Sequence, residues 1–225
     1  MFIFLDIGFT LLGGPAQGPA GRLVKHWNLP AGAKDWLNRV LFETPLESPG
    51  DLAQRMVHHF GLKETNVLPW VKDLWERQVT EAEPLPGARA ALQQLREAQI
   101  PFGFITNIWP PFLAGFARCF PEEYHACPMF ASCALGLAKP DPQLYRTALR
   151  QTGTDPREGV MIGDTYENDV LPAHGLGMRT IWVLTRPDKE RSDLVAVLNG
   201  EKPLPGRTLT GMEQFHPRQL QALFT

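Results

Sequence analysis

Side chains of the kind that handle phosphate and divalent cations follow several short apolar runs of this sequence. They are Asp6, Thr106 with Asn107, Lys139, and Asp164 with Asp169. A short apolar run that ends at a turn signal predicts a strand buried on both faces. Because the carboxyl ends of parallel strands lie along one edge of a sheet, where ligands bind, we expect these side chains to meet in one crevice.

These residue types together point to phosphoryl transfer. Crowded carboxylates stay ionised only at a high cost unless a cation neutralises them. A few hard oxygen ligands suit Mg²⁺, which keeps several waters and shares the phosphate of a substrate. A carboxylate nucleophile, a lysine and hydroxyl or amide donors complete the set. Each residue also has a structural alternative: Asp6 or Thr106 capping backbone amides, Lys139 or Asp169 exposed to solvent.

The elements that must position these residues alternate between strand and helix. Strands are predicted at 2–5, 101–105, 159–162 and 179–183, with weaker ones near 129–132 and Leu209. Helices are predicted at 88–98, 111–118, 141–151 and 168–175, and toward Leu223. This alternation favours an α/β fold with a parallel sheet and right-handed crossovers.

A different pattern fills residues 21–83, where apolar residues recur at three- and four-residue steps between prolines. It predicts a small insert of about four helices with its own core, in which the tryptophans pack. The Gly- and Pro-rich segments 11–19 and 84–87 are expected to be linkers or hinges. We therefore expect a core formed by residues 1–13 and 85–225, and a helical cap formed by residues 14–84.

Composition excludes some partners. Among the 225 residues are 22 basic and 24 acidic ones, so no basic surface for nucleic acid or membrane is indicated. No segment approaches the ~18 uninterrupted apolar residues of a membrane span, and no secretory leader is evident. The three cysteines lack a paired spacing, which is typical of a reduced cytoplasmic protein. The oligomeric state stays open.

The motifs and their order resemble those of the haloacid dehalogenase superfamily. The resemblance rests on Asp6-Ile7-Gly8-Phe9-Thr10, Thr106-Asn107, Lys139-Pro140-Asp141-Pro142 and Gly163-Asp164-Thr165-Tyr166-Glu167-Asn168-Asp169. It covers residues 1 to about 12 and about 85 to 183, and it implies a three-layer, Rossmann-like core. The helical insert resembles the cap of that family by its position after the first motif and by its helical content.

The resemblance also implies roles for individual residues. Asp6 would attack phosphorus and form an aspartyl-phosphate, and Thr106, Asn107 and Lys139 would hold the phosphate oxygens. Mg²⁺ would be bound by a set of four: Asp6, the backbone carbonyl of Gly8, Asp164 and Asp169. The expected substrate is a small phosphorylated metabolite whose identity the sequence does not give.

One position departs from the pattern of most phosphatases in the family, which have a second aspartate two residues after the nucleophile. Here it is Gly8, so the general acid/base is missing, an omission that typically costs about 10²–10⁴ in rate. The substrate would then have a good leaving group, such as an acyl or anomeric phosphate, or the cap would supply the acid. The candidate acids are His26, His58 and His59.

Three alternatives stay open. A 2-haloacid dehalogenase needs no metal and usually lacks the acidic fourth motif. A phosphonatase needs a cap lysine that forms a Schiff base, for which the candidates by region are Lys25, Lys34 and Lys63. A chain that has lost catalysis would bind phosphate ligands without turnover.

Overall fold

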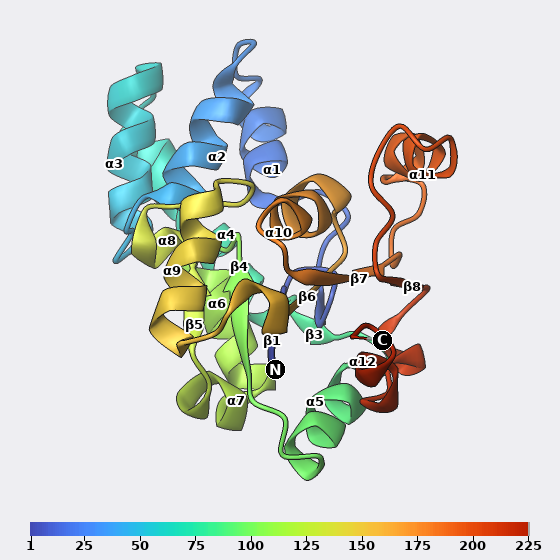
Figure 1. Ribbon diagram of the computed structural model, residues 1–225. Coiled ribbons are helices and arrows are strands. Elements are labelled where there is room, and N and C mark those ends of the chain that lie inside the picture. Colours follow the sequence, from blue (N-terminus) through green and yellow to red (C-terminus); the bar gives the residue numbers. More distant parts are fainter. Residues whose placement is uncertain (225) are drawn as a thin grey trace.

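The computed structural model describes residues 1–224, and the centre of the molecule is a six-stranded parallel sheet with the order β5-β4-β1-β6-β7-β8 (Figure 1). The strands are β1 (Phe2–Leu5), β4 (Phe102–Thr106), β5 (Met129–Ala131), β6 (Gly159–Gly163), β7 (Arg179–Val183) and β8 (Arg207–Leu209). Every neighbouring pair is parallel, which confirms the predicted sheet.

The order of the strands places a crevice at the end of β1. From β1 the chain continues on one side through β4 and β5, and it then returns to the other side of β1 to form β6, β7 and β8. Loops that leave the sheet in opposite directions separate at such a switch point, and the space between them is where open α/β sheets bind ligands. Asp6, Thr106 and Asp164 stand at or directly after the ends of β1, β4 and β6.

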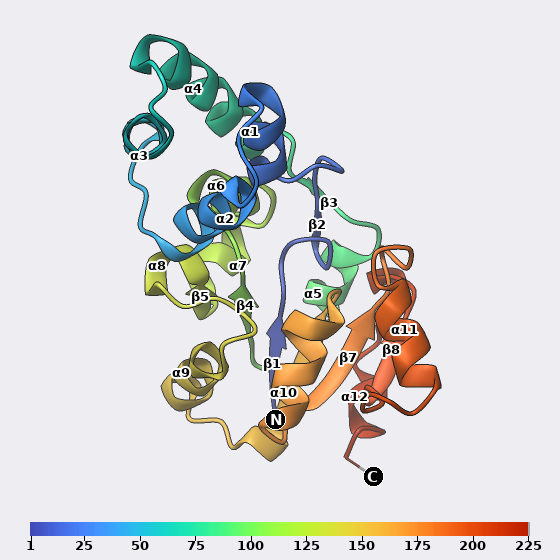
Figure 2. The same cartoon turned by 90° about the horizontal axis from the view of Figure 1, so that it is seen from above.

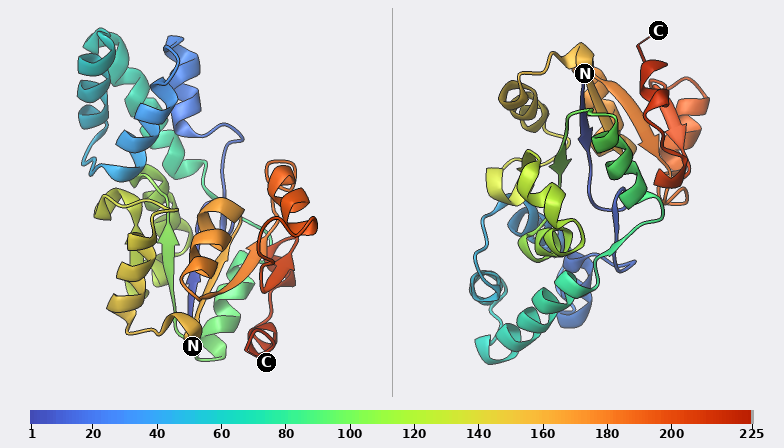
Figure 3. Two further views of the ribbon diagram at one scale, coloured as in Figure 1. Left: turned by 45° about the horizontal axis from the view of Figure 1, so that its top comes forward. Right: turned by 90° about the horizontal axis from the view of Figure 1, so that it is seen from below.

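Helices cover both faces of the sheet, so the core has three layers (Figures 2 and 3). On one face, Ile3 and Leu5 pack in a cluster with residues of α5, α6 and α12. On the other, Phe4 packs with residues of α9 and α10. The core helices are α5 (Ala88–Glu97), α6 (Pro110–Cys119), α7 (Pro121–Ala126), α8 (Ser132–Leu135), α9 (Pro142–Thr152), α10 (Leu171–Gly175), α11 (Arg191–Leu198) and α12 (Arg218–Gln221).

Residues 19–80 form four helices beyond the carboxyl end of the sheet (Figure 3). They are α1 (Pro19–Trp27), α2 (Ala33–Glu43), α3 (Pro49–Phe60) and α4 (Glu64–Thr80). Local sequence sets their ends: Ser48 and Asp51 form a capping box at the start of α3, and Gly61 ends that helix in the left-handed conformation. The four helices share a hydrophobic cluster, which Trp109 of the core also joins.

The connector between the core and these helices differs from its prediction as a linker. Leu12–Gly13 forms the strand β2, which pairs antiparallel with β3 (Glu83–Pro84). Leu11 and Leu12 are fully buried in the core cluster, because their apolar side chains outweigh the turn tendency of the glycines and prolines that follow. The chain therefore enters and leaves the helical segment along one two-stranded ribbon.

The predicted helix at 168–175 also differs in detail. It begins earlier, with a π-helical turn at Tyr166–Val170 that continues into α10. Short 3₁₀ turns lie at Pro156–Glu158 and Met212–Gln214. No helix in the described part of the chain has the length and apolar character needed to cross a lipid bilayer.

Candidate active site

Three carboxylates meet at the carboxyl end of the sheet. Asp6, Asp164 and Asp169 are each at most 5% exposed, and one ligand oxygen from each lies within 4.8 Å of the others. β1 delivers Asp6, while β6 and the π-helical turn deliver Asp164 and Asp169. Residues more than 150 positions apart in the sequence are thus close enough to share one cation, as expected from the strand ends.

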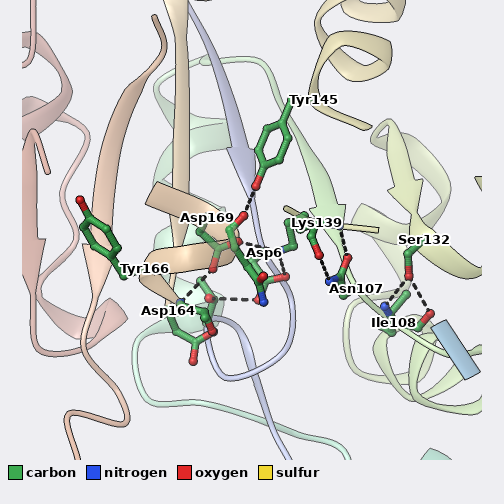
Figure 4. A network of polar contacts seen from close by, with 12 residues as sticks. Asp6, Asn107, Ile108, Ser132, Lys139, Tyr145, Asp164, Tyr166 and Asp169 are labelled. Carbon is green, nitrogen blue, oxygen red and sulfur yellow. Dashed lines mark hydrogen bonds and ion pairs between the residues drawn. The ribbon is translucent and has the colours of Figure 1, made fainter. Parts of the chain in front are cut away.

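Lys139 lies between two of these carboxylates (Figure 4). Its Nζ is 2.6 Å from Asp6 Oδ1 and 2.6 Å from Asp169 Oδ1, and the side chain is buried. The Asn107 side chain holds the lysine backbone on both sides: Nδ2 donates to the Lys139 carbonyl at 2.8 Å, and Oδ1 accepts from the Lys139 amide at 2.7 Å. The lysine is therefore fixed as the counter-ion of the site, and the role of Asn107 in phosphate binding stays a prediction.

Thr106 is the last residue of β4, and its side chain is fully buried. Its Oγ1 has no hydrogen-bond partner among the described residues. Buried hydroxyls are nearly always paired in proteins. The Thr106 hydroxyl is an exception, and it leaves a hydrogen-bond donor available at the end of β4, the strand next to β1. It does not cap the segment that follows, which was the structural alternative for this residue.

The turn after β6 is built around its carboxylates. A Cβ at Gly163 would lie 2.2 Å from Asp169 Cγ, so only glycine fits there. The Thr165 amide donates to Asp169 Oδ2 at 2.9 Å, and Trp182 Nε1 donates to the Asp164 carbonyl at 3.0 Å. Asp169 is 1% exposed, which removes the alternative that it is a solvent-exposed helix residue.

Burial and mutual repulsion shift the acidity of the cluster. Burial, and next the charge of Asp6, raises the pKa of Asp164 above its ordinary value. Burial also raises the pKa of Asp169, against the opposing effect of Lys139. Burial lowers the pKa of Lys139, but Asp169 and Asp6 outweigh it and leave that pKa above the ordinary value. The lysine is therefore a permanent cation, and the carboxylates are short of positive charge.

The structure adds a residue that the sequence analysis missed. Arg186, in the loop after β7, donates from Nε to Asp164 Oδ2 at 3.0 Å, and a second guanidinium nitrogen contacts the same oxygen. Three carboxylates thus face two cations. No motif marks Arg186; the only sequence signal is its place shortly after a strand of the same sheet.

A pocket of about 490 Å³ opens onto this cluster. Residues from the helical segment that line it include Asn38, Phe42, Glu43 and Gln78. None of the candidate cap acids or Schiff-base lysines is among the described residues that line it: His26, His58, His59, Lys25, Lys34 and Lys63. His26 instead stacks on Trp70 and His59 on Trp36, so these two side chains take part in aromatic packing.

Gly8 also lines the pocket, and a Cβ built there would meet nothing within 4 Å. The side chain that most related phosphatases carry at this position is therefore absent from a site that has room for it. Glu43, from the last turn of α2, is the titratable side chain of the helical segment that lines the pocket in the described structure.

The chain is similar in sequence to a known phosphatase and in fold to solved structures of HAD family enzymes. The phosphoserine phosphatase of Thermus thermophilus is 34% identical over 98 residues, which span 44% of this chain and 39% of that protein. A HAD family enzyme of Bacteroides thetaiotaomicron, crystallised with magnesium and inorganic phosphate, has a TM-score of 0.60 at 16% identity over 81% of this chain and 93% of its own.

A 2-haloacid dehalogenase of Pseudomonas syringae has a TM-score of 0.56 at 19% identity, over 100% of this chain and 99% of that one. At these identities the two solved structures share the fold with this chain, and their activities do not follow from that likeness. The family model for haloacid dehalogenase-like hydrolases matches residues 13–177, which is well over half of the chain. With its parallel sheet and helical insertion, this protein is a member of the haloacid dehalogenase-like hydrolase family.

Proposed function

We propose that this protein is a Mg²⁺-dependent phosphatase that cleaves a small phosphorylated metabolite through an aspartyl-phosphate on Asp6. The observation that carries the proposal is the cluster itself: three buried carboxylates with ligand atoms within 4.8 Å of one another, and Lys139 in contact with two of them. The fold relationship and the similarity to a phosphoserine phosphatase support it.

The residues present fit a hard divalent cation. Their donors are carboxylate oxygens, and the ionised cluster has one negative charge more than Lys139 and Arg186 neutralise. The cation would be held by Asp6, the carbonyl of Gly8, Asp164 and Asp169. When bound, Mg²⁺ supplies positive charge that stabilises the phosphoryl group during transfer.

The chain's own residues would carry out the chemistry in two displacements. An oxygen of Asp6 attacks phosphorus, and the bond from phosphorus to the leaving-group oxygen breaks, with the electron pair going to that oxygen. Water then attacks the phosphorus of the aspartyl-phosphate, which releases inorganic phosphate and restores the Asp6 carboxylate. Lys139, held by Asn107, offsets the charge at the nucleophile, and the free hydroxyl of Thr106 would donate to a phosphate oxygen.

The leaving group has to depart without an aspartate at position 8. This favours substrates whose leaving oxygen is already stable as an anion, such as acyl or anomeric phosphates. The cap carboxyl of Glu43 is the alternative source of a proton, because it lines the pocket. The pocket volume of about 490 Å³ suits a small ligand.

The two proposed segments of the chain have different tasks. The core, residues 1–13 and 85–225, performs the chemistry. The cap, residues 14–84, closes over it, excludes water and selects the substrate through Asn38, Phe42 and Gln78. The phosphonatase alternative lacks support, because no lysine of the described cap residues lines the pocket.

The test is a panel of phosphorylated metabolites, with 2-chloropropionate and phosphonoacetaldehyde included, assayed with Mg²⁺ and with EDTA. We expect Mg²⁺-dependent phosphate release that Asp6→Asn abolishes and that the exposed control Asp188→Asn retains. Activity retained by Asp6→Asn would exclude Asp6 as the nucleophile. Metal-free halide release, borohydride trapping of a cap lysine, or binding without any turnover would each replace the proposal with its corresponding alternative.

A further inference from the structure

The Asp164 carboxylate is held mainly through one of its two oxygens. Both contacting nitrogens of Arg186 reach the same oxygen, Oδ2, with Nε at 3.0 Å. The other oxygen, Oδ1, accepts a single long hydrogen bond from the Thr165 hydroxyl, at 3.3 Å. Charge-assisted contacts of a guanidinium have a fixed planar geometry, so they orient the carboxylate as well as neutralise it. Oδ1, with only this one weak contact, is the oxygen with capacity to bind a cation.

Arg186 is itself held in place by the turn after β1. Its guanidinium carbon lies 3.6 Å from the centre of the Phe9 ring, a cation–π contact. Phe9 has a φ of 59°, a left-handed conformation that is strained for a bulky residue and that tends to be kept where function needs it. The Thr185 hydroxyl donates to the Phe9 carbonyl at 2.6 Å, so the loop after β7 is tied to the same turn.

We propose that Arg186, supported by Phe9, is a positioning residue that orients Asp164 for the cation. The proposal rests on the metal site of the proposed function and assigns a task to a residue outside the shared motifs. Arg186 and the neighbouring Thr185 join the turn that carries Asp6 and Gly8 to the turn that carries Asp164, so both halves of the site are fixed together.

The direction in which Mg²⁺ affinity changes when Arg186 is replaced distinguishes a positioning role from a purely electrostatic one. A cation beside the site repels Mg²⁺, so if charge alone mattered, removing the guanidinium would tighten Mg²⁺ binding. If Arg186 orients Asp164, removing it weakens binding, because residues that hold a metal ligand typically contribute about 10–100-fold in affinity. The two effects oppose each other, and we expect the second to dominate because Asp164 is buried and has few other contacts to fix it.

The experiment is calorimetric titration of Mg²⁺ into the wild type, Arg186→Met and Arg186→Lys, with the exposed Arg191→Met as the matched control. We expect a Kd about 10–100-fold higher for Arg186→Met, an intermediate value for Arg186→Lys, and no change for Arg191→Met. An unchanged or tighter Kd for Arg186→Met overturns the proposal.

Phe9→Leu is the second variant, since it removes the ring and keeps the guanidinium beside Asp164. We expect it to weaken Mg²⁺ binding less than Arg186→Met does, and it serves in place of that variant if Arg186→Met does not fold. A Kd for Phe9→Leu equal to the wild type shows that Phe9 has no part. Asp164→Asn separates the two proposals: if the wild type does not bind Mg²⁺, or Asp164→Asn binds it equally well, the metal site of the proposed function is what fails.

Discussion

Replacing Lys139 with methionine tests the electrostatics of the cluster most directly. Methionine is similar in length to the lysine side chain but lacks the charge that Asp6 and Asp169 contact at 2.6 Å. In the variant, three buried carboxylates face the guanidinium of Arg186 alone. The metal-free protein should therefore be less stable, and added Mg²⁺ should restore stability because it supplies the missing positive charge.

The size of the expected stability loss follows from the burial of the ion pairs that Lys139 makes with Asp6 and Asp169. Breaking a buried ion pair by removing one partner costs about 3–5 kcal/mol, since the other charge is left without compensation. For a protein of this length, 1 kcal/mol shifts Tm by roughly 2–4 °C, so we expect Tm to fall by roughly 6–20 °C at pH 8. At pH 5.5 the loss should be smaller, because Asp164 and Asp169 have raised pKa values and take up protons there.

Thermal unfolding in EDTA and in Mg²⁺, at both pH values, measures each of these quantities. Lys72→Met is the control, since Lys72 is an exposed cap residue paired with Glu76 at 4.0 Å, and its Tm should stay within about 2 °C of the wild type. A Lys139→Met protein with the wild-type Tm in EDTA at pH 8 would refute the reasoning. So would a loss that is equal at both pH values and insensitive to Mg²⁺.

Two further predictions concern the acid and the protons of the site. Gly8→Asp should raise turnover of alkyl phosphates by about 10²–10⁴-fold and leave turnover of p-nitrophenyl phosphate nearly unchanged, because only the poor leaving group needs a proton. The open space at Gly8 leaves room for the new side chain. Equal effects on both substrates would contradict the missing-acid account. The Kd for Mg²⁺ should fall as the pH rises from 5 to 8, since burial raises the pKa of Asp164 and Asp169 and the cation must displace their protons. A Kd that calorimetry finds constant over this range would show that neither group titrates there.

The sequence predicted the strands well, for a physical reason. Strands buried on both faces must be short and apolar throughout, so Gly159–Gly163 and Phe102–Thr106 stand out in the sequence without knowledge of their partners. The direction of the chain alone then places the polar residue that follows each strand at the carboxyl edge of the sheet. Asp6, Thr106 and Asp164 could be placed in one crevice because parallel strands end on the same side. Lys139 was expected at a strand end as well, but it reaches the crevice from the loop after α8.

The contacts that tune the site could not be predicted in this way. Arg186 is one of many exposed-looking charges in the sequence, and its link to Asp164 depends on how the loop after β7 folds back. The fully buried Leu12 was hidden among glycines and prolines. Glu43 reaches the pocket only because the cap helices lie over the sheet, a tertiary arrangement that helical periodicity does not encode.

The ribbon formed by β2 and β3 has a consequence for how such a protein diversifies. Gly13 pairs with Glu83, so two positions separated by the whole helical insert are neighbours across one strand spacing, about 4.8 Å. A different insert would have to bring its ends together at that spacing and also cover Trp109, which packs against the helical segment. Under the proposed function, an exchange at this ribbon would change the segment assigned to substrate choice and leave the six central strands as they are.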